Sequence, residues 1–165
     1  MPPNYQLIDA ALLETTLARA RTTPRLRTNH NFHENDAANP HRFLNAMLRG
    51  TYCTPHRHSQ PPKSESFLVL RGAVVVFLFD EDGSIASRHV LSADGVLGID
   101  IPAGVWHSVA VLSASAVVYE VKPGPYLPTN DKEFAPWAPP EGDARASRYL
   151  AQLLASVPAP ELDPG

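Results

Sequence analysis

Residues 50–72 read GTYCTPHRHSQPPKSESFLVLRG and carry the densest set of metal-ligating side chains in the chain. His56 and His58 are two residues apart, and on an extended strand this spacing directs both imidazoles out of the same face. After a polar, proline-broken loop, Glu65 opens a strand that ends at Gly72, so its carboxylate can return beside the histidines. The stretch therefore predicts three metal ligands.

A fourth candidate ligand, His107, lies in a second cluster, Pro102-Ala-Gly-Val-Trp-His107. The Pro/Gly turn separates two apolar runs and places His107 early on the following strand. Three histidines and one carboxylate suit one divalent transition metal, such as Fe(II), Mn(II), Ni(II), Co(II) or Zn(II). The lack of a thiolate argues against a structural zinc knuckle. We expect open coordination positions for water or substrate.

These clusters resemble the two conserved motifs of the cupins. The first motif is matched by Gly50, His56-x-His58, Glu65 and Gly72, and the second by Pro102-x-Gly104-x-x-His107. The wider pattern is similar to the WbuC-type cupin metalloproteins, small bacterial proteins often associated with surface-polysaccharide gene clusters. Its matching segments are Arg25-x-Arg27-x-Asn29-His-Asn31-x-His33 and Glu120-Val-Lys122-Pro-Gly-Pro-Tyr126. The resemblance covers roughly residues 5–140.

The chain pattern independently favours an all-β domain. Short apolar runs recur between residues 43 and 122 with no helix among them, which is typical of an antiparallel sandwich or barrel. We expect strands at 43–48, 51–54, 66–70, 73–80, 85–91, 95–101, 105–112 and 116–122. The cupin resemblance implies a double-stranded β-helix, or jelly-roll barrel, with N- and C-terminal α-helices flanking it.

Two helices should flank the barrel, one capped by Asp9 over 10–21 and one capped by Asp143 over 144–156. We expect a single domain over residues 1–165. It would comprise a helical and polar extension (1–42), a barrel core (about 43–122), and a proline-rich wrap with the last helix (123–165). The apolar helices at both ends, with the cupin resemblance, predict a homodimer.

Composition narrows the function classes. With 14 Lys+Arg against 17 Asp+Glu, no nucleic-acid partner is indicated. Cys53 is the only cysteine, so no intramolecular disulfide forms. The N-terminus lacks signal-peptide features and no apolar run approaches about 20 residues, so we expect a cytoplasmic protein without a membrane partner.

The segment from Arg25 to Arg42 is too rich in cations and amides for a core. It is either a solvated loop or a cover over the barrel mouth whose arginine forks suit a carboxylate or phosphate. The resemblance adds weight to the second interpretation for Arg25, Asn31 and His33, and Arg27 is a further candidate anion anchor. His30 and His41 are expected at the surface.

Strand parity indicates further pocket residues. On an extended strand, Tyr52 would face the same side as the two histidines, so its phenol either lines the pocket or packs in the core. Cys53 should face the opposite side as a small core residue. On the last strand, Glu120 and Lys122 share one face with Val118. That face is either a pocket wall or an exposed surface with a weak ion pair.

Three function hypotheses remain open from the sequence. In the first, a metal enzyme acts on a small anionic substrate, with Glu120, Lys122 or Tyr126 moving protons and Arg25 or Arg27 holding the anion. The association with polysaccharide loci would make isomerisation or epimerisation of a sugar-derived substrate its chemistry. The second is a metal-dependent oxygenase, and the third is a non-catalytic cupin that binds or senses a small molecule.

Overall fold

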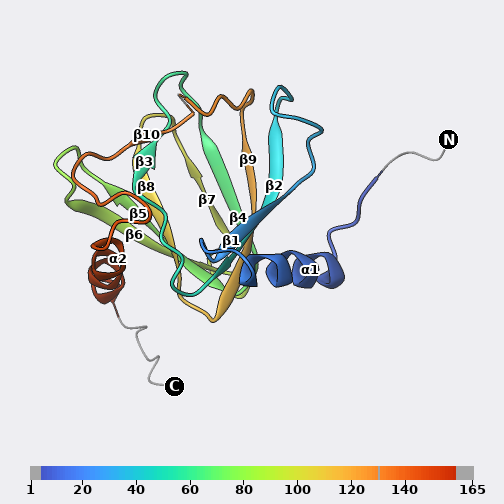
Figure 1. The fold of residues 1–165 in the computed structure, drawn as a ribbon, viewed down its shortest axis with the longest axis horizontal. Coiled ribbons are helices and arrows are strands. Elements are labelled where there is room, and N and C mark those ends of the chain that lie inside the picture. The colour runs from blue at the N-terminus through green and yellow to red at the C-terminus, as the bar shows by residue number, and fades with distance from the viewer. Residues whose placement is uncertain (1–4, 130, 159–165) are drawn as a thin grey trace.

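The computed structural model of the protein describes residues 5–129 and 131–158, and its strands form two antiparallel sheets that enclose a barrel (Figure 1). Sheet A joins β1 (Arg27–Asn31), β2 (His41–Leu48), β9 (Ser115–Lys122), β4 (Glu65–Arg71) and β7 (Gly98–Ile101), in that order. Sheet B joins β10 (Glu133–Phe134), β3 (His56–Arg57), β8 (Trp106–Val111), β5 (Ala73–Phe79) and β6 (Ile85–Ser92). This confirms the predicted all-β jelly roll with flanking helices.

The residues that point between the sheets change character along the strands. At one end they form the apolar half of the barrel: Met47, Phe67, Val69, Val74, Val76, Leu91, Ile101, Val109, Val111, Ala116 and Val118. At the other end, the polar half, the same strand faces carry Asn45, Glu65, His107, Glu120 and Lys122. The candidate site therefore lies inside the barrel, above a dry core.

Helix α1 (Ala10–Arg21) covers the outer face of sheet A, and helix α2 (Ala146–Ala155) covers that of sheet B (Figure 1). As predicted, the Asp9 carboxylate caps α1 by accepting from the Leu12 amide at 2.9 Å. Leu17 of α1 packs on sheet A, while Leu150 of α2 packs on sheet B. Within the described ranges, no helix is both long and apolar enough to span a membrane.

The predicted cap of the last helix is wrong. Helix α2 begins at Ala146, with Arg145 at the N-cap position and no side-chain cap. The carboxylate of Asp143 instead accepts from the backbone amide and the guanidinium of Arg145. This local contact between Asp143 and Arg145 competes with capping, so the helix begins at Ala146 and not at residue 144.

Three segments differ from the predicted strands. Residues 51–54 form no strand, because their carbonyls bond to side chains and Pro55 lacks an amide hydrogen. The polar segment after α1 is not simply a loop, since it supplies β1, which pairs with β2. The wrap supplies β10, which pairs with β3, so both sheets extend beyond the expected core of residues 43–122.

Candidate metal centre

The polar half of the barrel brings together the four predicted metal ligands. His56 lies on β3, His58 just after it, Glu65 at the start of β4 and His107 on β8. All four side chains are buried, and one ligand atom from each lies within 4.8 Å of those of the other three. The six residues between His58 and Glu65 turn back through a Ser59–Pro62 bridge, so this loop still returns the carboxylate to the histidines.

Backbone carbonyls fix the orientation of all three imidazoles. The Nδ1 atom of His56 lies 3.0 Å from the carbonyl of Thr54, and Nδ1 of His107 lies 2.9 Å from that of Val105. His58 makes the equivalent contact to a backbone carbonyl in the wrap. A carbonyl only accepts, so each Nδ1 carries the proton and each Nε2 offers a lone pair to the centre.

The ligand atoms of this group are arranged as they would be around a cation. The Nε2 atoms of His56 and His58 are buried and have no hydrogen-bond partner among the residues that the structure describes. The Nε2 atom of His107 lies 3.1 Å, and that of His58 3.4 Å, from Oε2 of Glu65. Lone pairs on all of these atoms would repel one another unless a cation lies between them. Three neutral imidazoles and a carboxylate are ligands that a divalent transition metal accepts, so the residues fit such an ion.

Electrostatics keep two of the ligands in the metal-binding form. Burial, with the charge of Lys132 nearby, lowers the pKa of His56 well below its usual value, so the ring is neutral. Burial alone would raise the pKa of Glu65, but its contacts with the His107 and His58 side chains, together with the charge of Lys122, outweigh burial and hold that pKa well below its usual value. Both groups are therefore ready to bind a cation near neutral pH.

A cavity of about 690 Å³ opens from the centre. Its size suits a small organic ligand. Its walls are mostly polar and include Arg25, Arg27, Asn31, His33, His41, Phe43, Asn45, Cys53, Glu120, Lys122, Tyr126, Lys132, Phe134 and Glu141. The segment after α1 thus lines the cavity. Of the two sequence interpretations, the structure agrees with the cover over the barrel mouth and not with the solvated loop.

Glu120 and Lys122 point into the cavity beside the ligand group. Glu120 is buried and accepts from the Asn45 amide at 2.8 Å. Burial, reinforced by the negative charge of Glu65, raises the pKa of Glu120 to about 8. Burial alone would lower the pKa of Lys122, but Glu65, Asp131 and Glu120 raise it. At neutral pH the cavity therefore holds a carboxylic acid next to an ammonium group.

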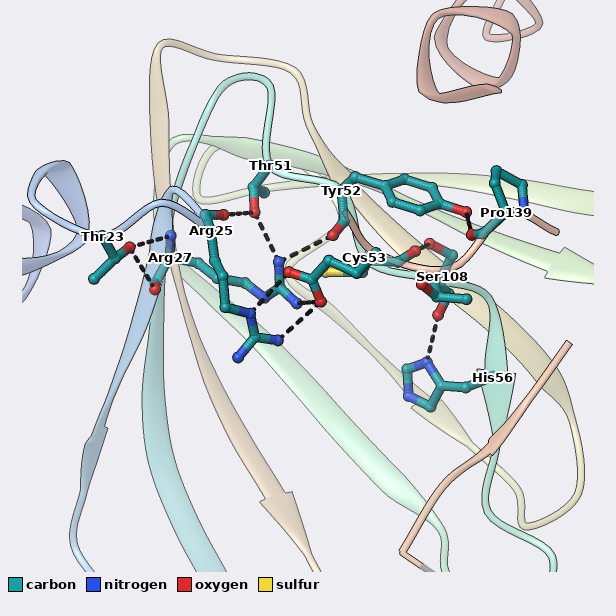
Figure 2. A network of polar contacts seen from close by, with 11 residues as sticks. Thr23, Arg25, Arg27, Thr51, Tyr52, Cys53, His56, Ser108 and Pro139 are labelled. Atoms are coloured by element: carbon teal, nitrogen blue, oxygen red, sulfur yellow. Dashed lines mark hydrogen bonds and ion pairs between the residues drawn. The ribbon is translucent and has the colours of Figure 1, made fainter. Parts of the chain in front are cut away.

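Arg25 and Arg27 meet at the cavity wall, where both bind the carboxylate of Glu141 (Figure 2). Arg27 also donates to the Thr51 hydroxyl at 3.1 Å and to the Tyr52 carbonyl at 3.0 Å. Figure 2 shows that the 51–54 loop carries this network on to His56. One loop therefore positions both an arginine and a candidate metal ligand.

The other predicted pocket residues divide into two groups. Asn31, His33 and Tyr126 line the cavity, whereas the Tyr52 ring packs outside it and its hydroxyl donates to the Pro139 carbonyl at 2.8 Å. Tyr52 thus follows the packing alternative. Cys53 packs against the apolar cluster, as expected of a small core residue, but it also lines the cavity wall, which strand alternation did not indicate because 51–54 is not a strand. His41, expected at the surface, is buried and stacks on His33.

Sequence reasoning missed the wrap's contribution to the site. Asp131 is buried and bonds to the ammonium groups of Lys63 at 2.7 Å and Lys122 at 3.2 Å, while its backbone carbonyl accepts from His58. Glu141, from the end of the wrap, joins the two arginines. The only sequence signal was acidic residues in a proline-rich segment, and only the folded chain brings these residues to the barrel.

Comparison with known proteins places the chain in a family. The model of the family described as "Domain of unknown function (DUF6016)" matches residues 8–91, about half of the 165 residues. The chain belongs to this family. The sequence matches no curated protein at a significant level.

Solved structures share the fold of this DUF6016 chain at low sequence identity. The capsular polysaccharide assembling protein CapF from Staphylococcus aureus matches with a TM-score of 0.58 and 22% identity over 68% of this chain and 32% of CapF. The chain therefore spans about a third of CapF. TT1209 from Thermus thermophilus matches with a TM-score of 0.54 and 21% identity over 73% of this chain and 98% of TT1209. BH2720 from Bacillus halodurans matches with a TM-score of 0.54 and 16% identity, covering 81% and 90%. These likenesses show the fold, a cupin-type double-stranded β-helix.

Proposed function

We propose that the protein is a WbuC-type, metal-dependent cupin enzyme that isomerises or epimerises a small anionic, sugar-derived substrate. The observation that supports this proposal most strongly is the joint placement of two groups in one cavity. Three imidazole Nε2 atoms and Glu65 converge on one point, and a buried Glu120 with a pKa of about 8 lies on the same wall. A cation site and a proton-transfer group are the parts that such chemistry needs.

Glu120 is the candidate acid and base. Isomerisation beside a carbonyl requires a group that removes a proton from one carbon and delivers it to the neighbouring carbon; epimerisation requires that a proton returns to the opposite face of the same carbon, for which Tyr126 is the second proton carrier. A carboxyl group whose pKa is near 8 both accepts and donates a proton near neutral pH, because its two protonation states are close in free energy. The Asn45 amide holds Oε1 of Glu120 and so fixes the direction of transfer.

Charged neighbours bind and orient the substrate. The ammonium group of Lys122 is anchored on Asp131 and presents positive charge to a developing oxyanion. Arg25 and Arg27 bind an anionic group at the wall of the cavity, and Tyr126 is a second proton carrier at its edge. A divalent metal, held by His56, His58, Glu65 and His107, would supply Lewis-acid polarisation of a substrate oxygen.

The biological setting is also a proposal. The WbuC resemblance supports a role in surface-polysaccharide metabolism, and CapF, a structural neighbour, is described as a capsular polysaccharide assembling protein. We place the chain in the cytoplasm as one domain over residues 1–165. A homodimer is supported by exposed Leu68, Leu70, Val96 and Leu97 near one edge of sheet A. A dominant monomer in light scattering at micromolar concentration would contradict the dimer.

The first experiment is elemental analysis of protein purified without chelator or added metal. We expect about one equivalent of iron, manganese, nickel, cobalt or zinc per chain, lost in a folded His56→Ala/His58→Ala variant because half of the ligand set is gone. His89→Ala is the matched control, since this exposed histidine on β6 bonds only to Ser87 among the described residues. A parent chain that holds no metal, even after reconstitution, would overturn the metal-dependent proposal.

The second experiment tests proton transfer. The metal-loaded protein is incubated in D₂O with a panel of sugar acids and ketoses, and deuterium at the carbon next to the carbonyl is followed by NMR. We expect exchange in the parent and its loss in Glu120→Gln, which keeps the amide contact but not the titrating group. Oxygen consumption with bound iron would instead favour the oxygenase, and ligand binding without either reaction would favour the sensor.

A further inference from the structure

We propose that Arg25 and Arg27 form a carboxylate subsite, which Glu141 fills with its own side chain until a carboxylate-bearing polyhydroxy ligand displaces it. This inference deepens the proposed function and rests on it, because it names the class of ligand that the same cavity takes. It assigns to Glu141 the role of an internal competitor.

The contacts around Glu141 match those expected for a bound carboxylate. Arg25 donates from Nε to Oε1 at 2.8 Å and from Nη2 to Oε2 at 3.1 Å, and Arg27 donates from Nη2 to Oε2 at 2.7 Å. Two guanidinium groups thus grip one carboxylate in the fork geometry that favours planar anions. A planar carboxylate on a ligand would find the same donors.

Arg27 is built into the wall rather than free to follow Glu141. Its Nη1 atom donates to the Thr51 hydroxyl and the Tyr52 carbonyl, and the Thr51 hydroxyl donates in turn to the carbonyl of Arg25 at 2.7 Å. The Arg27 side chain is 11% exposed, against 62% for Arg25. The subsite therefore has one buried arm and one exposed arm, and it keeps positive charge even when Glu141 occupies it.

Glu141 is poised to leave. Among the described residues its carboxylate bonds only to these two arginines, and its side chain is one-third exposed. Gly142 follows at a φ of +87° with open space around it, so the backbone can turn there without a clash. A displaced carboxylate could therefore rotate into water without being left buried and unpaired.

The rest of the cavity wall selects a hydroxyl-rich body for the ligand. Asn29, Asn31, His33, Asn45 and Tyr126 line it with donors and acceptors, and few apolar groups accompany them. The backbone links the subsite to the metal centre, because the carbonyl of Tyr52 accepts from Arg27 and that of Thr54 accepts from His56. A polyhydroxy acid would present its carboxylate to the arginines and hydroxyl groups to the rest of the cavity.

The test compares D-gluconate with D-glucitol, which has the same hydroxyl-bearing carbon chain but no carboxylate, by isothermal titration calorimetry. Glu141→Gln removes the competing charge and keeps the size of the side chain. We expect this variant to bind D-gluconate at least fivefold more tightly than the parent, with no change for D-glucitol. In Arg25→Gln/Glu141→Gln the gain should disappear, because one arm of the fork is lost.

Glu133→Gln is the matched control. Glu133 also lies in the wrap and also forms a two-point ion pair, with Arg57 at 2.9 Å, but neither residue lines the cavity. This variant should bind D-gluconate as the parent does. The subsite is overturned if folded Glu141→Gln binds D-gluconate no more tightly than the parent, or if Glu133→Gln gains as much. Metal content, measured on the same samples, reports separately on the proposed metal centre.

Discussion

The polar and apolar halves of the barrel are built from the same strand faces, yet different forces hold them. In the apolar half, fully buried side chains such as Met47 and Val76 fill the space between the sheets. In the polar half, the side chains instead surround a cavity, where buried charges such as Glu65, Lys122 and Asp131 pair with one another or converge as candidate cation ligands. The first half gains free energy from burial, while the second pays desolvation costs that only correct pairing offsets.

This difference shows which structural properties of a residue strand alternation predicts and which it does not. On β9, Glu120 points inward just as Val118 does, two residues away. Alternation therefore predicts which face a side chain occupies, whereas the position along the strand decides whether it serves the core or the site. The four predictions that follow test this division, and they run from the largest expected effect to the smallest.

Removing the central anion of the polar half should have the largest effect on stability. In Asp131→Ala, the ammonium groups of Lys63 and Lys122 lose their shared carboxylate while remaining buried. We expect the free energy of unfolding to fall by about 4 kcal/mol, measured by urea denaturation. A loss under about 1 kcal/mol would mean that water reaches the two ammonium groups and that the buried pairing with Asp131 contributes little to stability.

The apolar half should respond to lost volume rather than to lost charge. Met47→Ala removes a fully buried side chain from the apolar cluster. We expect about 3 kcal/mol of destabilisation, with the metal content of the folded variant unchanged. If metal content fell together with stability, the two halves would not be independent.

Glu120 should make the stability of the metal-free protein depend on pH. Burial raises the pKa of Glu120 from 4.5 to about 8, so the folded state binds this proton more tightly than the unfolded state does. Its stabilising contribution is complete below pH 4.5 and is lost as the pH rises through about 8.

The matched variant is Glu120→Gln, which does not titrate and retains an acceptor for Asn45. Relative to it, the parent should lose a few kcal/mol of its free energy of unfolding across that pH window, measured by denaturation at several pH values. A difference that stays constant with pH would show that the carboxyl group titrates normally.

The smallest effect is expected outside the barrel, at the ion pair between Glu133 and Arg57. This pair is partly exposed, and Arg57 keeps its contacts with Glu81 and with the Trp106 ring, 4.2 Å away, after Glu133→Gln. We expect the free energy of unfolding to change by less than about 1 kcal/mol. A larger loss would show that β10 depends on this pair for its attachment to β3.

Much of the fold follows from local sequence signals. Asp9 and Pro24 bracket the first helix, and the structure gives it the predicted bounds, Ala10–Arg21. The hairpin of β5 and β6 follows from two apolar runs around a turn with Gly83, which adopts a φ of +86°. β1 was missed because an edge strand of polar residues lacks the apolar alternation that marks a buried strand.

The site was predictable where its residues lie on regular strands and not elsewhere. The spacing of His56, His58 and His107, together with the alternation at Glu120 and Lys122, indicated side chains that the structure brings together in one ligand group and the cavity beside it. Strand alternation left Tyr52 between pocket and packing and did not indicate that Cys53 reaches the cavity wall, because alternation has no meaning in an irregular loop. Asp131, Lys63 and Glu141 could not be found, because long-range contacts alone determine where these loop residues lie.

The contact between the Asp131 carbonyl and His58 couples two processes that otherwise look unrelated. The wrap holds one imidazole in the tautomer that a metal ligand needs, so detaching the wrap would weaken binding of the proposed metal. Thermodynamic reciprocity then requires the metal to fasten the wrap by the same free energy. Loading the centre should therefore slow proteolysis between residues 123 and 129, a readout of coordination that needs neither a substrate nor a spectroscopic signal.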